Sequence, residues 1–156
     1  SLVLDHVTVD SLQASLSDFT HVSAVNQTRT SLDSLGGALT VTIEAGSSLI
    51  LNGTSDLTTL ILGEHASLTL QGLPSDAVVV DITGTTNYTL SLTEIPASLD
   101  NIKFLNDGVL YDAAMSMDLQ ANSAMLFAQV PEPGSAALAL AGLAPLLWRR
   151  RRKMSH

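Results

Sequence analysis

The chain has 156 residues, enough for one domain with a moderate core, and it contains no cysteine. Disulfide scaffolds and metal sites built on thiolates are therefore excluded. Five of the seven basic residues are consecutive, at 149–153, so residues 1–148 carry two basic and fifteen acidic side chains, a net charge of −13. Such an acidic body disfavours nucleic-acid binding.

The beginning of the chain shows strand alternation rather than a leader sequence. No basic segment precedes an apolar run, so no signal peptide is expected in this stretch. Leu2, Leu4, Val7 and Val9 predict one strand, and we expect the chain to be the C-terminal part of a longer precursor. Residues 11–37 are polar, and residues 30–35 are expected to form a helical turn.

From residue 38 onward, apolar residues recur in i, i+2 pairs, the period of a β-strand. The pairs are Val41/Ile43, Leu49/Leu51, Leu60/Leu62, Leu68/Leu70, Val80/Ile82, Tyr88/Leu90, Ile102/Phe104 and Val109/Tyr111. Short and longer steps alternate, and residues 48–53 (Ser-Leu-Ile-Leu-Asn-Gly) align with residues 67–72 (Ser-Leu-Thr-Leu-Gln-Gly) at an offset of 19.

This repeat predicts an all-β body. A β-solenoid with rungs of about 20 residues is the preferred interpretation, and an antiparallel β-sandwich is the alternative. In a solenoid the paired apolar residues face inward, Ser and Thr face outward, and the glycines between the pairs lie in turns. Alternation at residues 124–130 predicts a last strand covering the open end of the stack.

Candidate catalytic and metal-binding residues are sparse in the body. His6, His21, His65 and His156 lack the spacing of a metal-binding motif, so no catalytic residue, metal or cofactor is expected. One group of oxygen-bearing side chains could suit calcium: Asp100, Asn101, Asn106, Asp107 and Asp112. A turn at residues 106–108 is the preferred interpretation of that group. The aromatic residues Tyr88, Phe104 and Tyr111 fall in inward pairs and are expected in the core.

The C-terminal segment has three parts in a fixed order. Pro131-Glu132-Pro133 ends the body, giving a domain at 1–130 and a linker at 131–135. Residues 136–148 are uncharged and apolar, which predicts a short transmembrane helix. Residues 149–156 form a basic tail that the positive-inside rule places in the cytoplasm, with the body outside. A simple anchor without processing is the alternative.

Residues 130–153 resemble a PEP-CTERM sorting signal, as found on exported proteins of bacteria that make exopolysaccharide. The resemblance implies removal of the tail by exosortase, a membrane-embedded protease or transpeptidase. Pro131, Glu132 and Pro133 would be the recognition residues. The stop-transfer cluster would consist of Arg149, Arg150, Arg151, Arg152 and Lys153. The implied partners are exosortase, the inner membrane transiently and exopolysaccharide, with no nucleic acid.

These observations favour a non-enzymatic, exported surface or extracellular-matrix protein with an adhesive or stalk-like β-repeat body. Its precursor would be tethered to the inner membrane, and its mature form would lie at the cell surface or outside the cell. The alternative is the C-terminal fragment of a β-helix polysaccharide lyase or hydrolase, and a third hypothesis is a calcium-dependent adhesion module.

Overall fold

In the computed structural model, residues 1–14, 19–34, 40–52, 57–71 and 76–129 are described. They form thirteen strands: β1 (Leu2–Asp5), β2 (Ser11–Ala14), β3 (His21–Val25), β4 (Arg29–Ser34), β5 (Thr40–Ile43), β6 (Ser48–Asn52), β7 (Thr59–Leu62), β8 (Ala66–Leu70), β9 (Val78–Asp81), β10 (Tyr88–Leu92), β11 (Ile102–Asn106), β12 (Val109–Asp118) and β13 (Ser123–Ala128). The predicted C-terminal helix at 136–148 lies outside the described residues.

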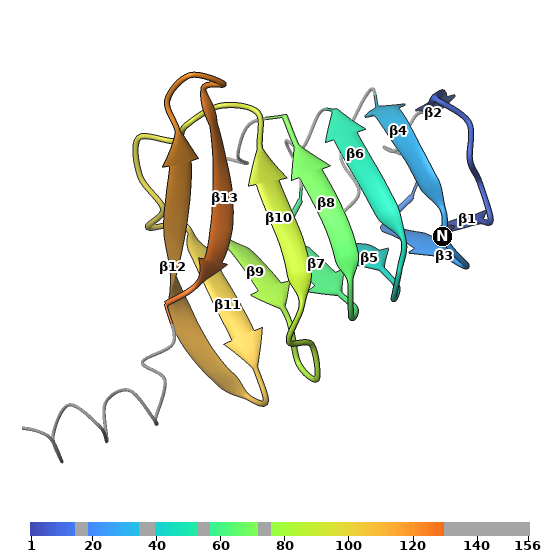
Figure 1. Cartoon of the computed structure of the whole chain (residues 1–156). Coiled ribbons are helices and arrows are strands. Elements are labelled where there is room, and N and C mark those ends of the chain that lie inside the picture. Colours follow the sequence, from blue (N-terminus) through green and yellow to red (C-terminus); the bar gives the residue numbers. More distant parts are fainter. Residues whose placement is uncertain (15–18, 35–39, 53–56, 72–75, 130–156) are drawn as a thin grey trace, which may run out of the picture.

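The strands coil into a β-solenoid, as the repeat predicts (Figure 1). Odd-numbered strands β1 to β11 pair in parallel along one sheet, and even-numbered strands β2 to β10 pair in parallel along the other. Each rung contributes one strand to each sheet. The parallel pairing rules out the antiparallel sandwich, because consecutive strands from β1 to β11 lie in different sheets rather than side by side.

The register agrees with the repeat read from the sequence. Leu49 pairs with Leu68 and Val41 with Leu60, each at the offset of 19. Strands β5, β7 and β8 bury alternate residues, and these apolar side chains fill the space between the two sheets. The largest buried side chains are Phe104, Leu32, Ile43, Leu49, Leu57, Leu60, Leu62, Leu68, Leu70, Leu90 and Leu92. Backbone hydrogen bonds and apolar burial therefore stabilise the stack together.

Buried hydroxyl groups line the short corner that leads from one sheet to the other. Thr28, Ser47 and Thr85 lie at this corner on different rungs and are buried. The Thr28 hydroxyl donates to the Leu4 carbonyl over 2.8 Å, and the Thr85 hydroxyl donates to the Leu62 carbonyl over 2.8 Å. Since a buried carbonyl without a partner is costly, these hydroxyls stabilise the corners where the strand ladder stops.

The N-terminal region forms solenoid rungs, which corrects two expectations. Residues 29–34 form strand β4 rather than a helical turn, because they pair in parallel with both β2 and β6 and bury Thr30 and Leu32. The first strand ends at Asp5, and His6 has a left-handed φ of 56°, so residues 2–9 are not one strand. The inward positions of this region include the small Ala24 and the polar Thr30, which concealed the alternation.

An antiparallel hairpin closes the C-terminal end of the stack, opposite to the edge strands β1 and β2 (Figure 1). The first part of β12 pairs with β11, its second part pairs with β13, and β13 pairs with β10. Strand β12 thus joins the two sheets. The strand expected near residues 124–130 is present as β13. Val109, predicted to face inward, is 50% exposed at the first position of β12, directly after the turn at Asp107 and Gly108.

A two-residue turn at Asp107 and Gly108 connects β11 to β12. Their φ angles are 51° and 78°, and Asn106 pairs with Val109 across the turn. Positive φ at both central residues matches the hairpin turn that Asp-Gly favours. The structure therefore confirms the preferred interpretation of residues 106–108 as a turn.

Candidate functional site at the C-terminal hairpin

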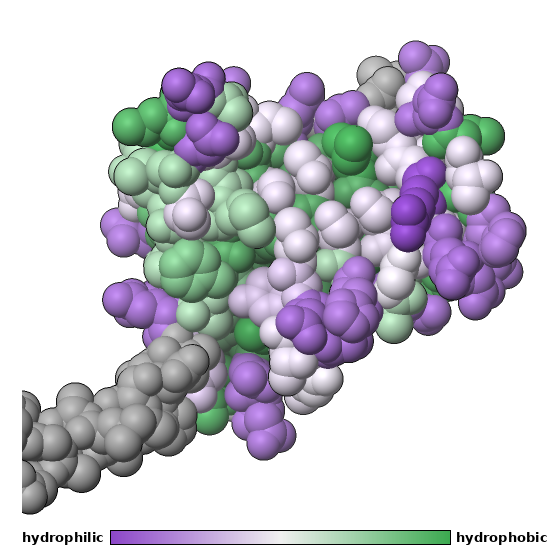
Figure 2. All heavy atoms as spheres, viewed as in Figure 1, coloured by the Kyte–Doolittle hydropathy of each residue, from purple (hydrophilic) through white to green (hydrophobic). Residues whose placement is uncertain are grey.

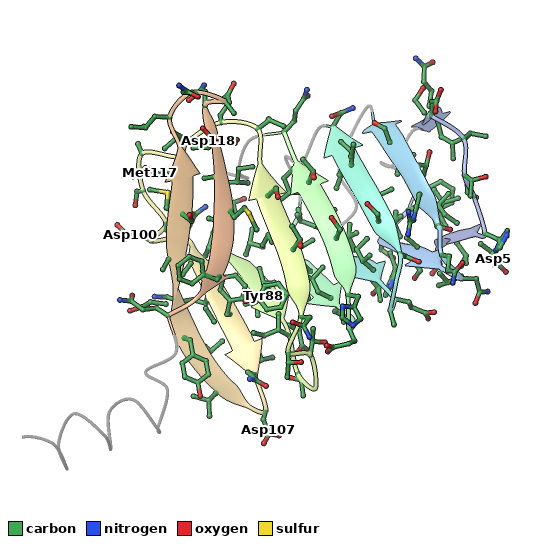
Figure 3. All side chains as sticks on the ribbon, viewed as in Figure 1. Asp5, Tyr88, Asp100, Asp107, Met117 and Asp118 are labelled. Atoms are coloured by element: carbon green, nitrogen blue, oxygen red, sulfur yellow. The ribbon has the colours of Figure 1, made fainter. Side chains whose placement is uncertain are left out.

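Hydrogen bonds to the body fix the backbone up to the residue at which the sorting segment begins. Tyr88 lies beside the end of β13 (Figure 3), and its hydroxyl oxygen accepts a hydrogen bond from the Ala128 amide over 3.2 Å. The Gln129 amide donates to the Asp112 carbonyl over 2.7 Å. Burial raises the pKa of Tyr88, which therefore stays neutral near pH 7. The backbone is thus fixed two residues before Pro131.

The sorting-signal residues themselves follow this anchored end. Pro131, Glu132, Pro133 and the cluster 149–153 lie outside the described residues, as do the linker and helix boundaries predicted from the sequence. No helix in the described part of the chain has the length and apolar character needed to cross a membrane. The site that the structure describes is therefore the hairpin from which the signal extends.

Apolar side chains gather on this hairpin. Nine large apolar side chains are exposed among the described residues, and six of them lie between residues 109 and 127. They are Val109, Leu110, Met117, Leu119, Met125 and Phe127, with exposed fractions of 44% to 79%. Figure 2 shows the green, apolar surface over β12 and β13, whereas the neighbouring strands present mostly pale, near-neutral side chains. The hairpin therefore differs in chemistry from the rest of its sheet.

The pale surface beside the hairpin consists of outward hydroxyl groups. On β8 and β10 the outward positions are Ser67, Thr69, Thr89 and Ser91, and the register pairs Ser67 with Thr89 and Thr69 with Ser91. Hydroxyl-bearing side chains thus form rows across the sheet, as the sequence predicts. The rows end at β13, where Met125 pairs with Ser91. The change from hydroxyl to apolar side chains therefore coincides with the change from solenoid rungs to the closing hairpin.

One carboxylate organises an enlarged corner near the hairpin. Paired residues are offset by 20 between β7 and β9 and by 22 between β8 and β10, so this corner contains two extra residues. Glu64 accepts hydrogen bonds from the backbone and side-chain groups of Thr86 and Asn87 over 2.9 to 3.2 Å. Hydrogen bonds from the Thr86 amide and then the Asn87 side chain hold the pKa of Glu64 below its usual value.

An open depression of about 320 Å³ lies beside this corner. Its lining residues are His65, Thr86, Asn87, Tyr88 and Thr89. His65 has a φ of 58° and an exposed side chain, as expected for a solvated turn residue. The positions of Glu64, Thr86 and Asn87 are explained by support of the turn, so their polar contacts already serve the fold.

The candidate calcium residues do not converge. Asn101 donates to the Asp76 carbonyl over 3.1 Å, while Asp112 forms an ion pair with Lys103 across β11 and β12. Within the described ranges, no three His, Asp or Glu side chains lie close enough together to hold a metal ion. The other described histidines are also separate: His6 contacts the Asn26 carbonyl, and His21 contacts the Thr42 hydroxyl.

The aromatic residues divide between the core and the surface. Phe104 is fully buried, and its ring centroid lies 6.0 Å from that of the half-buried Tyr88. Tyr111 packs against the core and is half buried. Phe127 is 44% exposed on the outward face of β13. Alternation with the inward residues Ala124 and Leu126 could have identified this outward position.

The fold and the anchored C-terminal end thus define a β-solenoid body that leads directly into a sorting segment. Residues 129–153 match the PEP-CTERM protein-sorting motif. No curated protein and no solved structure matches the chain. The chain therefore carries a PEP-CTERM signal, which implies export and processing by exosortase at the membrane.

Proposed function

We propose that this chain is the non-catalytic body and sorting signal of a bacterial surface or extracellular-matrix protein. The main support for this proposal is that the sorting motif begins at residue 129, directly after the last strand of the closing hairpin ends at Ala128. Only Val130 lies between the anchored backbone at Gln129 and the Pro-Glu-Pro recognition segment. Processing within that segment releases the body with its stack closed at the C-terminal end.

The surface of the body supports a structural role. Its outward rows of Ser and Thr are polar with few charges, which suits contact with a hydrated polymer such as exopolysaccharide. The polar groups with described partners stabilise the fold: Glu64 supports a corner, and Lys103 pairs with Asp112. The apolar residues 136–148 hold the precursor in the inner membrane, and the cluster 149–153 keeps the end of the chain in the cytoplasm.

Mass spectrometry of the C-terminal peptide tests this function. The chain is expressed in a host that has exosortase and in the same host without it. We expect a terminus between residues 130 and 135 in the extracellular fraction of the first host, and the intact chain in the membrane fraction of the second. An intact tail in both hosts would leave only a simple anchor and would remove the exosortase assignment.

Substitution of the recognition segment provides a second test in the same host. Replacing Pro131, Glu132 and Pro133 by Ala is expected to leave the full-length chain in the membrane fraction. Deleting residues 154–156, beyond the basic cluster, is the control and should leave processing unchanged. Equal processing of both variants would show that these three residues are not the recognition element.

A further inference from the structure

We propose that the apolar face of the β12–β13 hairpin rests on the lipid surface while the sorting signal still anchors the precursor. This inference rests on the proposed membrane-tethered precursor and adds a second, reversible contact between the body and the bilayer. The hairpin face is defined by Met125 and Phe127 on β13 and by their cross-strand partners Ser116 and Ala114 on β12.

The position of the face favours a membrane as its occupant. Phe127 lies two residues before Gln129, where the anchored backbone ends. Seven peptide steps lead from Gln129 to the apolar run at Ala136, and a fully extended chain covers at most about 25 Å over that length. The anchor therefore holds the hairpin close to the bilayer, so that even a weak contact is favoured by the high effective concentration.

The charge distribution favours the same orientation. Residues 1–148 carry a net charge of −13, so most of the body is repelled by anionic lipid headgroups. Asp112 and Asp118 flank the hairpin face on β12: Asp112 is paired with Lys103, and Asp118 accepts hydrogen bonds from the Gln120 and Ala121 amides. The body can thus approach the bilayer through this face without bringing an unpaired carboxylate to its centre. Half-exposed Met and Phe side chains can then insert at the headgroup boundary.

The size of the face argues against a stable pair of chains. Met125 and Phe127 are 50% and 44% exposed, so they offer roughly 100 Å² each. Their cross-strand partners are the small residues Ala114 and Ser116, which add little. A stable dimer buries about 800 Å² on each partner. A bilayer needs no such area from the body, because the membrane anchor supplies the remaining affinity.

Site-specific labelling can test the contact because the chain contains no cysteine. The full chain with Ser116→Cys carries an environment-sensitive fluorophore and is reconstituted in vesicles of phosphatidylethanolamine and phosphatidylglycerol. Some of the lipids bear a nitroxide quencher. We expect the emission to fall several-fold relative to vesicles without the quencher. The control is Thr59→Cys, on the outward face of the other sheet, whose emission should not change. Equal emission changes at the two positions would overturn the proposal.

Surface variants identify the side chains responsible. The pair Met125→Ser and Phe127→Ser, introduced with Ser116→Cys, is expected to abolish the quenching. Ile50→Ser, which removes an exposed apolar side chain away from the hairpin, should preserve it. Quenching that survives the paired change would overturn the assignment to this face. If the paired variant melts early, the comparison of Ser116→Cys with Thr59→Cys decides the question.

The remaining outcomes are distinct. Self-quenching that rises with protein density but ignores the nitroxide lipid would assign the face to a second copy and would refute the lipid contact. Tail processing is measured separately by mass spectrometry. Normal processing without lipid quenching would overturn only the further inference, whereas quenching without processing would overturn only the exosortase role.

Discussion

Replacement of Leu68 by Ala tests the central feature of the fold, the stacking of inward side chains from successive rungs. Leu68 is fully buried on β8, and its strand partners are Leu49 on β6 and Leu90 on β10. Truncation opens a cavity between three rungs, and we expect a loss of about 3–5 kcal/mol in the free energy of unfolding. Because each rung is stabilised by its neighbours, the cavity weakens the interfaces on both sides of β8.

For a body of this size, each kcal/mol corresponds to about 3–4 °C in Tm, so the expected decrease is about 9–20 °C. The assay is thermal unfolding of the full chain followed by circular dichroism. Thr69→Ala, on the adjacent outward position, is the matched control and should shift Tm by no more than about 2 °C. Equal decreases for the two variants would refute the inward and outward assignment.

Further predictions concern the polar contacts. Because the folded-state pKa of Glu64 is lowered, its carboxylate stabilises the fold above about pH 4.5. This contribution is lost as the pH falls through the folded-state pKa. Glu64→Gln should therefore make the stability of the fold less sensitive to acid. Between pH 7 and about pH 3, the Tm of Glu64→Gln should therefore fall less than the Tm of Glu44→Gln. The Glu44→Gln variant is the control, because it changes a residue at the same corner one rung earlier. Thr28→Val, which leaves buried carbonyls without their donor, should cost about 1–3 kcal/mol in urea unfolding, whereas the outward Thr59→Val should be nearly neutral. A Thr28→Val variant as stable as Thr59→Val would contradict the role of the corner hydroxyls.

Much of the solenoid could be predicted from the sequence because its signal is local and repeated. The Leu-x-Leu pairs at 49, 51, 68 and 70 have the strand period, and their offset equals the register of the paired strands. Residues 21–34 escaped recognition because their inward positions include Ala24 and Thr30 rather than large apolar residues. Where inward side chains are small or polar, the alternation of inward and outward positions becomes visible only in the folded structure, once the strands are paired.

The sequence also predicted one part of the candidate site, the sorting signal, better than the other part, the hairpin face. The sorting signal depends on the order of consecutive segments, so its recognition from residues 130–153 needed no tertiary information, and the motif match confirms it. The hairpin face could not be predicted equally well. Alternation with Ala124 and Leu126 places Met125 and Phe127 outward, but only the pairing of β13 with β12 and β10 shows which side chains surround them.

The sequence by itself determined the all-β class, the period of the rungs and the identity of the sorting signal, because each follows from spacing along the chain. The tertiary structure decided that the sheets are parallel, that β12 joins them, and that Tyr88 and Asp112 anchor the chain where the signal begins. The two anchoring hydrogen bonds, for example, join residues that are 40 and 17 positions apart. Local periodicity specifies which face a side chain occupies, but only the folded chain specifies what that face meets.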